Sequence, residues 1–473
     1  MDRPSLNLDI LVHLMTFVDR KTLADLMLTS KMLNGEAAKE RLRRGVQLFG
    51  PQAICSFLHF MCRAILCRLP YVKELDIAPG VDGLSLPLPL ARQLAIFFFV
   101  LGVMPQYGRL RTLGVWSVEE LLRSDESLAL AIARIPTIKH LTLEGVGPHA
   151  RRLLGCMQCQ LLSADITIAR PDDPSFFDNS LEPDPTNPSM YVFGRSQETL
   201  CELRITDSLS ASHCARYQNM TVLSLKLLEM PRISDYVRAF PKLKSLVIDV
   251  QSSGFDQSEM DVQRALNRRE QATQGSWPRL NRYDGYPCTL YHLGITCPIT
   301  SVELKDGGHV FEPALLKAAL EDACPRDLAL SITRGDVSFK GEFLAALSKK
   351  AIQNLRKFDL TISLLPDQDD NNVYVQDMLN SVRSEILARL PSLTTFKLRF
   401  DAEFITLFPE LEDEYPPLNV LEEQLAGWDM PAFASEAFKA AESGNLWEVV
   451  LSLTGHRARN DIRTTYLRDG GNR

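Results

Sequence analysis

A nine-residue pattern of apolar and polar positions recurs along the chain. It reads apolar-Pro-x-apolar-x-x-apolar-x-apolar, and complete copies lie at residues 69–77, 135–143, 240–248 and 390–398. The final apolar-x-apolar segment predicts a short strand, because alternate side chains of a strand point to the same face. Four copies with the same spacing indicate a repeated structural unit.

Variants without the proline keep the same spacing. They lie at residues 110–115, 200–205, 220–225, 355–360 and 446–451, and a weaker strand is predicted at 166–168. Stretches that precede strands, such as 127–135 and 375–390, have apolar residues at helical spacing. The unit is therefore predicted to be a helix followed by a strand. The more closely spaced units fit the ~20 to 29 residue period of leucine-rich repeats.

The first 46 residues have a helical pattern instead. Helices are predicted at residues 8–18, 22–28 and 31–43, with Asp19 capping the second and Gly45 ending the third. The first helix is apolar along two stripes, which consist of Leu8, Leu11, Val12 and Met15, and of Ile10, Leu14, Phe17 and Val18. A module of about 40 residues can barely cover one face of such a helix, so a partner or the rest of the chain must cover the other.

Composition and charge exclude several classes of protein. With 45% hydrophobic and 23% charged residues, the chain has the composition of a globular protein rather than of a disordered one. The formal net charge of -7 argues against nucleic acid as the main partner, because binding to phosphates requires a basic surface.

The sequence predicts a protein that stays inside the cell, in the cytoplasm, the nucleus or both. Residues 1–18 carry charged side chains and lack the apolar stretch of a secretory signal. The longest apolar run, residues 94–104, is shorter than the ~20 residues that cross a bilayer, and we interpret it as a buried helix. No membrane partner is expected, and the cysteines are expected to remain thiols.

These patterns divide the chain into four parts. Residues 1–46 are predicted to form a three-helix domain, 47–68 a linking helix, 69–455 the repeat domain and 456–473 a C-terminal tail. Two insertions are expected in the repeats: a proline-rich exposed loop near 170–190 and a surface helix of mixed charge near 251–284. The predicted fold class is α/β, with a three-helix start followed by an irregular solenoid of parallel strands inside and helices outside.

A C-x-x-C motif is the first candidate for further chemistry. It consists of Cys156 and Cys159, and the nearby histidines are His140 and His149. Zinc requires four ligands, and no second pair with zinc-finger spacing follows. Free, buried cysteines are therefore favoured over a metal site.

An acidic cluster is the second candidate. Asp367, Asp369 and Asp370 lack the glycine and the distal glutamate of a calcium loop, which favours a solvated turn. The chain also has no phosphate-binding glycine loop, nucleophile elbow or H-E-x-x-H motif. We therefore predict no cofactor, no metal and no catalytic residue.

The N-terminal helices carry a specific spacing of leucines and polar residues. The positions are Leu6-Asn7-Leu8-Asp9-Ile10-Leu11, then Leu14, Phe17, Thr22-Leu23, Leu26, Ser30-Lys31 and Leu33. This stretch resembles the F-box, in which the first segment reads Leu-Pro-x-Glu-Ile-Leu. Asn7 stands where the family has proline, and Asp9 where it has glutamate. With the repeats that follow, the chain resembles F-box proteins with degenerate leucine-rich repeats, especially fungal ones.

The resemblance implies a substrate-recognition subunit of an SCF-type ubiquitin ligase, which is not itself catalytic. In that family the F-box binds a Skp-family adaptor, which links to a cullin and a RING protein, and the distal domain binds the target protein. The adaptor-facing positions carried over are Leu6, Asn7, Ile10, Leu11, Leu14, Leu23 and Leu33. The alternative is that these residues form only the core of the small domain, but the two apolar stripes favour an interface.

If the repeats stack, the residue between the paired apolar positions of each strand points to the concave face. These candidate target-binding residues are Asp76, Thr142, Arg204, Ser224, Glu303, Asp359 and Lys397. Their charges are mixed, so the sequence does not predict a partner of a single charge sign. Trp116, just past a strand tip, is a candidate aromatic anchor, and core packing explains it about as well.

Two other functions are consistent with the sequence. One is an F-box interaction scaffold that acts outside a ubiquitin ligase, which an adaptor-binding test distinguishes from the ligase subunit. The other is an enzyme whose active residues lie in the irregular insertions. Such an enzyme would have a deep pocket with converging polar groups in place of a broad open face.

Overall fold

The computed structural model of the protein describes most of the chain, in two units. Its described residues are 7–80, 86–169, 193, 195–208, 215–227, 231–250, 257–305, 312–333, 342–347, 349–364, 375–403, 418, 420–441, 444–457 and 459–468. Unit 1 draws its described residues from 1–226 and 239–242, and unit 2 draws them from 227–238 and 243–473.

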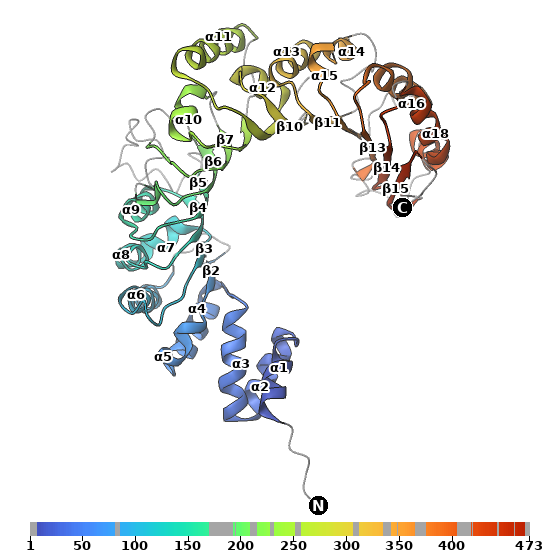
Figure 1. The fold of residues 1–473 in the computed structure, drawn as a ribbon. Helices are drawn as coiled ribbons and strands as arrows, with labels where there is room; N and C mark the ends of the chain where they lie inside the picture. The colour runs from blue at the N-terminus through green and yellow to red at the C-terminus, as the bar shows by residue number, and fades with distance from the viewer. Residues whose placement is uncertain are drawn as a thin grey trace, which may run out of the picture. The chain divides into compact units, whose positions relative to one another are not determined.

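Unit 1 begins with three helices and continues with alternating strands and helices (Figure 1). Its elements are α1 (Leu8–Met15), α2 (Arg20–Thr29), α3 (Lys31–Arg43), β1 (Val46–Phe49), α4 (Gly50–Cys62), α5 (Ile65–Arg68), the 3-10 turn Leu69–Tyr71, β2 (Glu74–Ala78), α6 (Leu88–Val103), β3 (Thr112–Val115), α7 (Val118–Ser124), α8 (Ser127–Ala133), β4 (His140–Val146), α9 (Pro148–Cys156), β5 (Ser163–Ile168), β6 (Glu202–Ser208) and β7 (Val222–Leu227). The three helices predicted for the N-terminal stretch are therefore present.

Unit 2 continues the alternation of helix and strand. Its elements are α10 (Ile233–Ala239), β8 (Ser245–Val250), α11 (Gln257–Gln274), β9 (Leu280–Gly285), α12 (Pro287–Leu293), β10 (Ile299–Lys305), α13 (Pro313–Ala323), β11 (Asp327–Thr333), α14 (Glu342–Ala346), α15 (Lys349–Ile352), β12 (Lys357–Ser363), α16 (Val375–Ser381), the π-turn Val382–Ile386, the 3-10 turn Leu387–Arg389, β13 (Thr395–Asp401), α17 (Val420–Ala426), α18 (Met430–Ala440), β14 (Glu448–Thr454) and β15 (Ile462–Leu467).

The strands follow one another in the order of the chain, from β1 to β7 in unit 1 and from β8 to β15 in unit 2. In unit 1, β1 to β6 pair in parallel. In unit 2 the pairs from β8 to β14 are parallel, and only β14 and β15 are antiparallel among the described strands. The fold is thus α/β with mostly parallel strands, as the sequence predicted.

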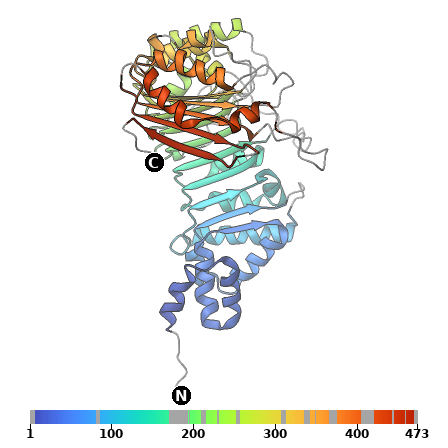
Figure 2. The ribbon, with the colours of Figure 1, turned by 90° about the vertical axis from the view of Figure 1, so that its right-hand side faces the viewer.

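Helices cover one face of the strands in unit 1. The helices α6, α8 and α9 lie on the same side of β2 to β5 (Figure 1), and the strands run side by side (Figure 2). Burial alternates accordingly, since in β5 the residues Ala164, Ile166 and Ile168 are buried and the residues between them are half-buried. Parallel sheets are usually covered on both faces. We call the face opposite these helices the open face of unit 1.

The nine-residue pattern corresponds to a helix end followed by a strand. In its first copy Leu69 lies in a 3-10 turn, and the amide of Val72 donates to the carbonyl of Leu69 at 3.1 Å. Leu69, Val72, Leu75 and Ile77 are all fully buried. The four apolar positions are therefore core positions, and the polar positions between them face solvent or the strand neighbours.

The apolar run at 94–104 lies in α6, as predicted. Leu94, Phe98 and Leu101 are fully buried, and Phe97 packs edge-to-face against Phe57 of α4 with ring centroids 5.3 Å apart. The prediction of a buried helix holds for one side only, because Ile96 is 63% exposed.

Three strands lie where the sequence predicted other structure. β1 starts the sheet next to the predicted linking helix, which is divided into α4 and α5. The predicted insertion at 251–284 contains α11 as expected, but it also contains β9, which joins the sheet between β8 and β10. The predicted tail contains β15, which pairs with β14.

The reason for each difference is a weak apolar pattern. β1 has only four residues, the adjacent residues Asn281 and Arg282 of β9 are both exposed, and in β15 only Tyr466 is buried. These segments form strands because of hydrogen bonds to neighbouring strands. The sequence of the segment alone does not show those hydrogen bonds. The proline-rich loop predicted near 170–190 lies outside the described residues, as do Asp367, Asp369 and Asp370.

Candidate functional site

The N-terminal helices α1 to α3 begin at side-chain caps. The Oδ1 atom of Asn7 accepts from the amide of Asp9 at 3.0 Å, and Asp19 Oδ1 accepts from Thr22 at 2.7 Å. The amide hydrogen bond from Thr22 also lowers the pKa of Asp19. Ser30 caps α3 through the amide of Leu33 at 3.2 Å. The cap at Asp19 was predicted from the sequence, and Asn7 takes the same role at the start of α1.

An arginine holds α1 against the end of α3. Arg44 Nη2 donates to the carbonyl of Met15 at 2.6 Å, and Nη1 donates to the carbonyl of Val18. Arg44 also pairs with Glu40 at 3.2 Å. These bonds orient α1 so that Met15, which is 1% exposed, packs with Leu23 in the core of the three helices.

The opposite side of α1 is exposed. Ile10 is 53% exposed, Leu14 48% and Phe17 74%, at positions i, i+4 and i+7. The helix, predicted over residues 8–18, ends at Met15, so Ile10 and Leu14 share a face of α1 and Phe17 lies in the turn that follows it, where its amide donates to the carbonyl of Leu14 at 3.0 Å. We call Ile10, Leu14 and Phe17 the α1 stripe. Large apolar side chains gathered on one exposed face are typical of a docking surface.

Six of the seven candidate adaptor residues lie within the described residues, and they fall into exposed, half-buried and buried groups. Ile10 and Leu14 are exposed, while Leu11 and Leu33 are half-buried. Leu23 is fully buried, so its side chain packs within the three helices, which is the core role that the sequence left open. Asn7 is an exposed cap, and Leu6 lies outside the described residues.

Three further apolar residues are exposed on these helices or next to them. Phe17, Leu28 and Met32 are 74%, 86% and 59% exposed and were not among the candidates. Phe17 was visible in the sequence, because it belongs to the same stripe as Ile10 and Leu14. Leu28 and Met32 flank the junction of α2 and α3, and no periodicity marks them.

The open face of unit 1 aligns the predicted target-binding residues. The strand register places Asp76, Gly114, Thr142, Asp165 and Arg204 side by side, from β2 to β6. Asp76, Thr142 and Arg204 are thus in one row, as the sequence pattern implies, and Ser224 has the same position within β7. Asp165 was missed because its strand was read as weak.

One ion pair lies within this row. Arg204 Nη1 is 3.3 Å from Asp165 Oδ2. Burial raises the pKa of Asp165, and the neighbouring charge of Arg204 opposes that effect. By contrast, Asp76 and Glu144 have no hydrogen-bond or ion-pair partner among the residues that the structure describes.

Two aromatic residues lie at the end of the same face. Phe49 ends β1 and is 62% exposed, and its ring centroid lies 6.5 Å from that of the half-buried Trp116. A Cβ atom placed on Gly114 would lie 3.4 Å from the Trp116 ring and would clash with a carboxylate oxygen of Asp76. The missing side chain at Gly114 therefore leaves room for the Trp116 ring and the Asp76 carboxylate to approach each other.

In unit 2 the corresponding face carries paired charges. Glu303, Asp359 and Lys397 share one row, with Asp284 before them and Ala329 between Glu303 and Asp359. Lys397 Nζ is 3.7 Å from Asp359 Oδ2. Burial raises the pKa of Asp359, and Lys397 opposes that effect. The three predicted residues are therefore together, but two of them neutralise each other.

A second set of pairs crosses β9 and β10. Arg282 lies 3.1 Å from Asp284 and 2.8 Å from Glu303, and Lys305 lies 3.1 Å from Asp284. The sequence did not predict this set, because β9 was read as part of an insertion. Its only local signal was the alternation of Arg282 and Asp284 around the buried Tyr283.

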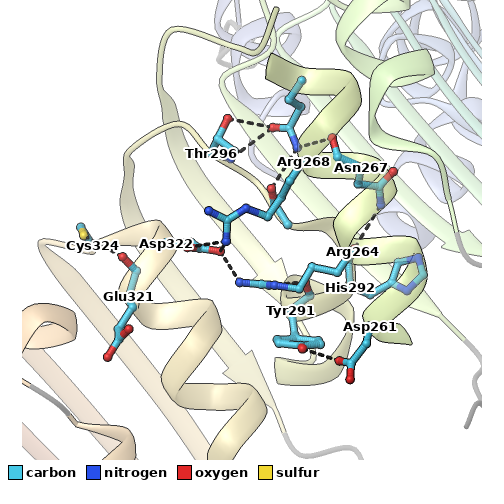
Figure 3. A network of polar contacts seen from close by, with 12 residues as sticks. Asp261, Arg264, Asn267, Arg268, Tyr291, His292, Thr296, Glu321, Asp322 and Cys324 are labelled. Atoms are coloured by element: carbon cyan, nitrogen blue, oxygen red, sulfur yellow. Dashed lines mark hydrogen bonds and ion pairs between the residues drawn. The ribbon is translucent and has the colours of Figure 1, made fainter. Parts of the chain in front are cut away.

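A buried polar network joins α11 to α12. Asn267 is fully buried, accepts from the amide of Ile233 at 3.1 Å and donates to the carbonyl of His292 at 3.1 Å (Figure 3). Gln271 donates to the carbonyl of Gly294 at 2.9 Å. These side-chain amides bond to backbone N–H and C=O groups that have no partner within their own helix, because they lie at a helix end.

Charged groups extend the network to α13. Arg264 pairs with Asp322 and donates to the carbonyl of Tyr291, and Arg268 lies 3.4 Å from Asp322 (Figure 3). The Tyr291 hydroxyl donates to Asp261. Each of these charges has a partner, so we interpret the network as structural support for the helix layer of unit 2.

Of the two cysteines in the C-x-x-C motif, Cys159 is buried as expected and has the properties of an unreactive thiol, whereas the expectation of burial is wrong for Cys156. Cys156 is exposed and Cys159 is buried, and both are free. Burial raises the pKa of the Cys159 thiol to about 11. A reactive cysteine requires a lowered pKa. His149 is engaged elsewhere, because its Nδ1 lies 2.7 Å from Glu119. Within the described residues, no group of three or more His, Cys, Asp or Glu side chains could hold a metal ion.

Among the described helices, none alone has the length and hydropathy of a membrane span. The segments Gly50–Cys62 and Ile65–Tyr71 reach those values only when taken together, and a bend of 102° separates them.

Comparisons with known proteins yield little. No protein-family model matches the chain, and no curated protein matches it. A solved structure of Bacillus subtilis pyridoxal kinase in complex with ADP aligns with 14% sequence identity and a TM-score of 0.20, over 47% of this chain and 71% of that chain. A likeness of this degree supports no conclusion about fold or function.

Proposed function

We propose that the protein is a substrate-recognition subunit of an SCF-type ubiquitin ligase. Helices α1 to α3 act as an F-box that binds a Skp-family adaptor, and the strand and helix units act as degenerate leucine-rich repeats that bind the target protein. The chain performs no catalysis. It raises the effective concentration of target lysines near a ubiquitin carrier.

The α1 stripe is the observation that carries this proposal. Ile10, Leu14 and Phe17 expose three large apolar side chains, although Met15 on the same helix is fully packed. Exposing such a row to water is unfavourable by about 25 cal/mol for each Å² of apolar surface, which a partner would recover. Of the residues carried over from the F-box pattern, Ile10 and Leu14 belong to this exposed stripe, which supports the proposal.

The proposal is tested by capturing the adaptor with the full chain. We expect Ile10→Asp combined with Leu14→Asp to weaken adaptor binding about 100-fold or more, because each substitution places a charge in an apolar interface. Both side chains are half-exposed, so the thermal unfolding of the variant should match that of the parent chain. Binding is measured with purified adaptor by calorimetry, and cullin is scored in a pull-down from cells.

The matched control places the same charges on another exposed apolar face. Ile96 and Val103 of α6 are 63% and 55% exposed. The variant Ile96→Asp with Val103→Asp should therefore bind the adaptor as the parent chain does. Failure of the parent chain to bind any adaptor would exclude the ligase role. Adaptor binding without cullin in the pull-down would instead favour an interaction scaffold that acts outside a ligase.

A further inference from the structure

The open face of unit 1 ends in a combination of groups that recognises a specific chemistry. Phe49 and Trp116 form a partly exposed aromatic pair with ring centroids 6.5 Å apart. Asp76 lies next to it, because both the Trp116 ring and the Asp76 carboxylate reach the space above Gly114. An aromatic face next to a carboxylate attracts a cation by two independent effects, the ring quadrupole and the ion pair.

The carboxylates of this surface form no ion pair among the described residues. The Arg20 guanidinium, beside the Gln47 that neighbours Asp76 on β1, donates instead to Gln47 and to the carbonyls of Arg44 and Gly45. Asp76, Glu74 and Glu144 lie on β2 and β4, and none of them has a hydrogen-bond or ion-pair partner among the described residues. The nearest pair in the row, Asp165 with Arg204, lies two strands away from Gly114. The surface around Trp116 therefore offers negative charge and an aromatic face to the same ligand.

We propose that Phe49, Trp116 and Asp76 bind an arginine side chain of the target protein. This inference rests on the proposed function, since it names the chemistry that the open face of unit 1 recognises. The guanidinium group stacks on the Trp116 ring and donates to the Asp76 carboxylate, and the exposed Phe49 ring packs against the aliphatic part of the arginine side chain.

Arginine fits this site better than lysine or an anion does. Its planar guanidinium is weakly hydrated, stacks on an aromatic ring and presents several donors in one plane, whereas the lysine ammonium is a strongly hydrated point charge. The unpartnered acids exclude phosphate and acidic peptides by repulsion. The partner is therefore a basic segment of a protein.

The test uses capped pentapeptides with the full-length protein labelled with 5-fluorotryptophan. The probes are Gly-Gly-Arg-Gly-Gly, the same peptide with lysine and the same peptide with citrulline, which has the shape of arginine without its charge. The chain has four tryptophans, so four fluorine signals are expected. Trp116→Leu assigns the signal of interest, and Trp447, which is 51% exposed, serves as the internal control.

We expect the arginine peptide to shift the Trp116 signal and to bind about five-fold more tightly than the citrulline peptide. The lysine peptide should bind with intermediate affinity. Asp76→Asn should weaken arginine binding about five-fold. Glu202→Gln, an exposed acid on β6 of the same face, should leave it unchanged. Added salt should weaken the arginine peptide and not the citrulline peptide.

Equal affinities for the arginine and citrulline peptides would overturn the inference, as would a shift at Trp447 as large as that at Trp116. Adaptor capture by the Asp76→Asn variant separates this inference from the proposed function. If that variant captures the adaptor and no peptide binds, only the arginine site fails. If the arginine peptide binds and no adaptor is captured, the site stands and the ligase role fails.

Discussion

Unit 1 and unit 2 are built from the same helix and strand pattern, yet the groups that bind their carboxylates differ. In unit 1 the buried Glu119 of α7 accepts from the amides of Gly147, His149 and Ala150 at 3.0 to 3.1 Å. Those amides form the start of α9, where free N–H groups need acceptors. On the open face of the same unit, Asp76 has no partner among the described residues.

In unit 2 arginine and lysine side chains bind the carboxylates. The buried Glu422 of α17 forms a paired hydrogen bond with Arg457, which raises the pKa of the arginine. On the strand face, Asp284 contacts Arg282 and Lys305, while Asp359 contacts Lys397.

The difference indicates which face is prepared for a charged partner. A ligand that approaches the strand face of unit 2 must displace charges already paired within the chain. A cation that approaches Asp76 displaces no hydrogen-bond or ion-pair partner among the described residues. The same repeat pattern thus produces a strand face with paired carboxylates in unit 2 and, in unit 1, a face on which Asp165 is paired with Arg204 but Asp76 is not, because the polar residue between the buried leucines is free to vary.

Removal of the buried carboxylate in unit 1 is expected to have the largest effect. Glu119→Gln places an amide donor against the N–H groups that start α9 and should lower the free energy of unfolding by about 4 kcal/mol. Hydrogen exchange at the amides of Gly147, His149 and Ala150, combined with urea unfolding, measures the loss. Glu120→Gln, at the neighbouring and more exposed position, should change stability by less than about 0.5 kcal/mol. Equal effects of the two substitutions would show that the amides of α9 have other acceptors.

Acidification should weaken unit 2 through a buried histidine. Burial lowers the pKa of His292 to about 4 from its usual value of 6.5. Between those values the unfolded chain binds a proton that the folded chain does not bind, so stability falls as the pH drops from 6.5 to 4. The full loss is about 3 kcal/mol.

The measurement for this effect is hydrogen exchange of α11 and α12 as a function of pH. The variant His292→Gln should be less stable at neutral pH and should lose this part of the pH dependence. His59→Gln, at an exposed position of α4 in unit 1, is the matched control and should keep it. A pH profile that is unchanged in His292→Gln would assign the acid sensitivity to other groups.

The ion pair between β12 and β13 should contribute least. Asp359 and Lys397 are 3.7 Å apart, and their side chains are 39% and 41% exposed. A double-mutant cycle with Asp359→Asn and Lys397→Met should give a coupling of about 0.5 kcal/mol or less. The helix pair Glu385 and Arg389, at 3.5 Å, provides a comparison for which a similar value is expected. A coupling above about 1.5 kcal/mol would mean that water screens this ion pair less than the exposed fractions of its side chains indicate.

Much of the fold could be predicted because its signal is local. Leu75 and Ile77, like Leu141 and Leu143, occupy alternate positions that only a strand with one buried face explains. The row of candidate residues on each face follows from the same periodicity, since a parallel register brings equivalent positions together. Strands without strong alternation, such as β9, could not be predicted, because hydrogen bonds to neighbouring strands select them.

The division of roles within the N-terminal helices could not be predicted from spacing. Leu14 and Leu23 both belong to the leucine pattern, but Leu14 is 48% exposed and Leu23 is fully buried. Helical periodicity identifies residues that share a face and does not state which face meets another helix. Arg44, which holds α1 in its orientation, lies 29 residues from Met15 and carries no local signal of that contact.

The sequence by itself determined the class of fold, the positions of most strands and the existence of an unusually apolar first helix, because these properties depend on side-chain periodicity within one segment. The tertiary structure decided which charges are paired and which are left to solvent. It also brought Phe49 of β1 to Trp116, which follows β3. Such pairs depend on strand register across segments that are distant in the chain, and the pattern within any one segment does not contain that information.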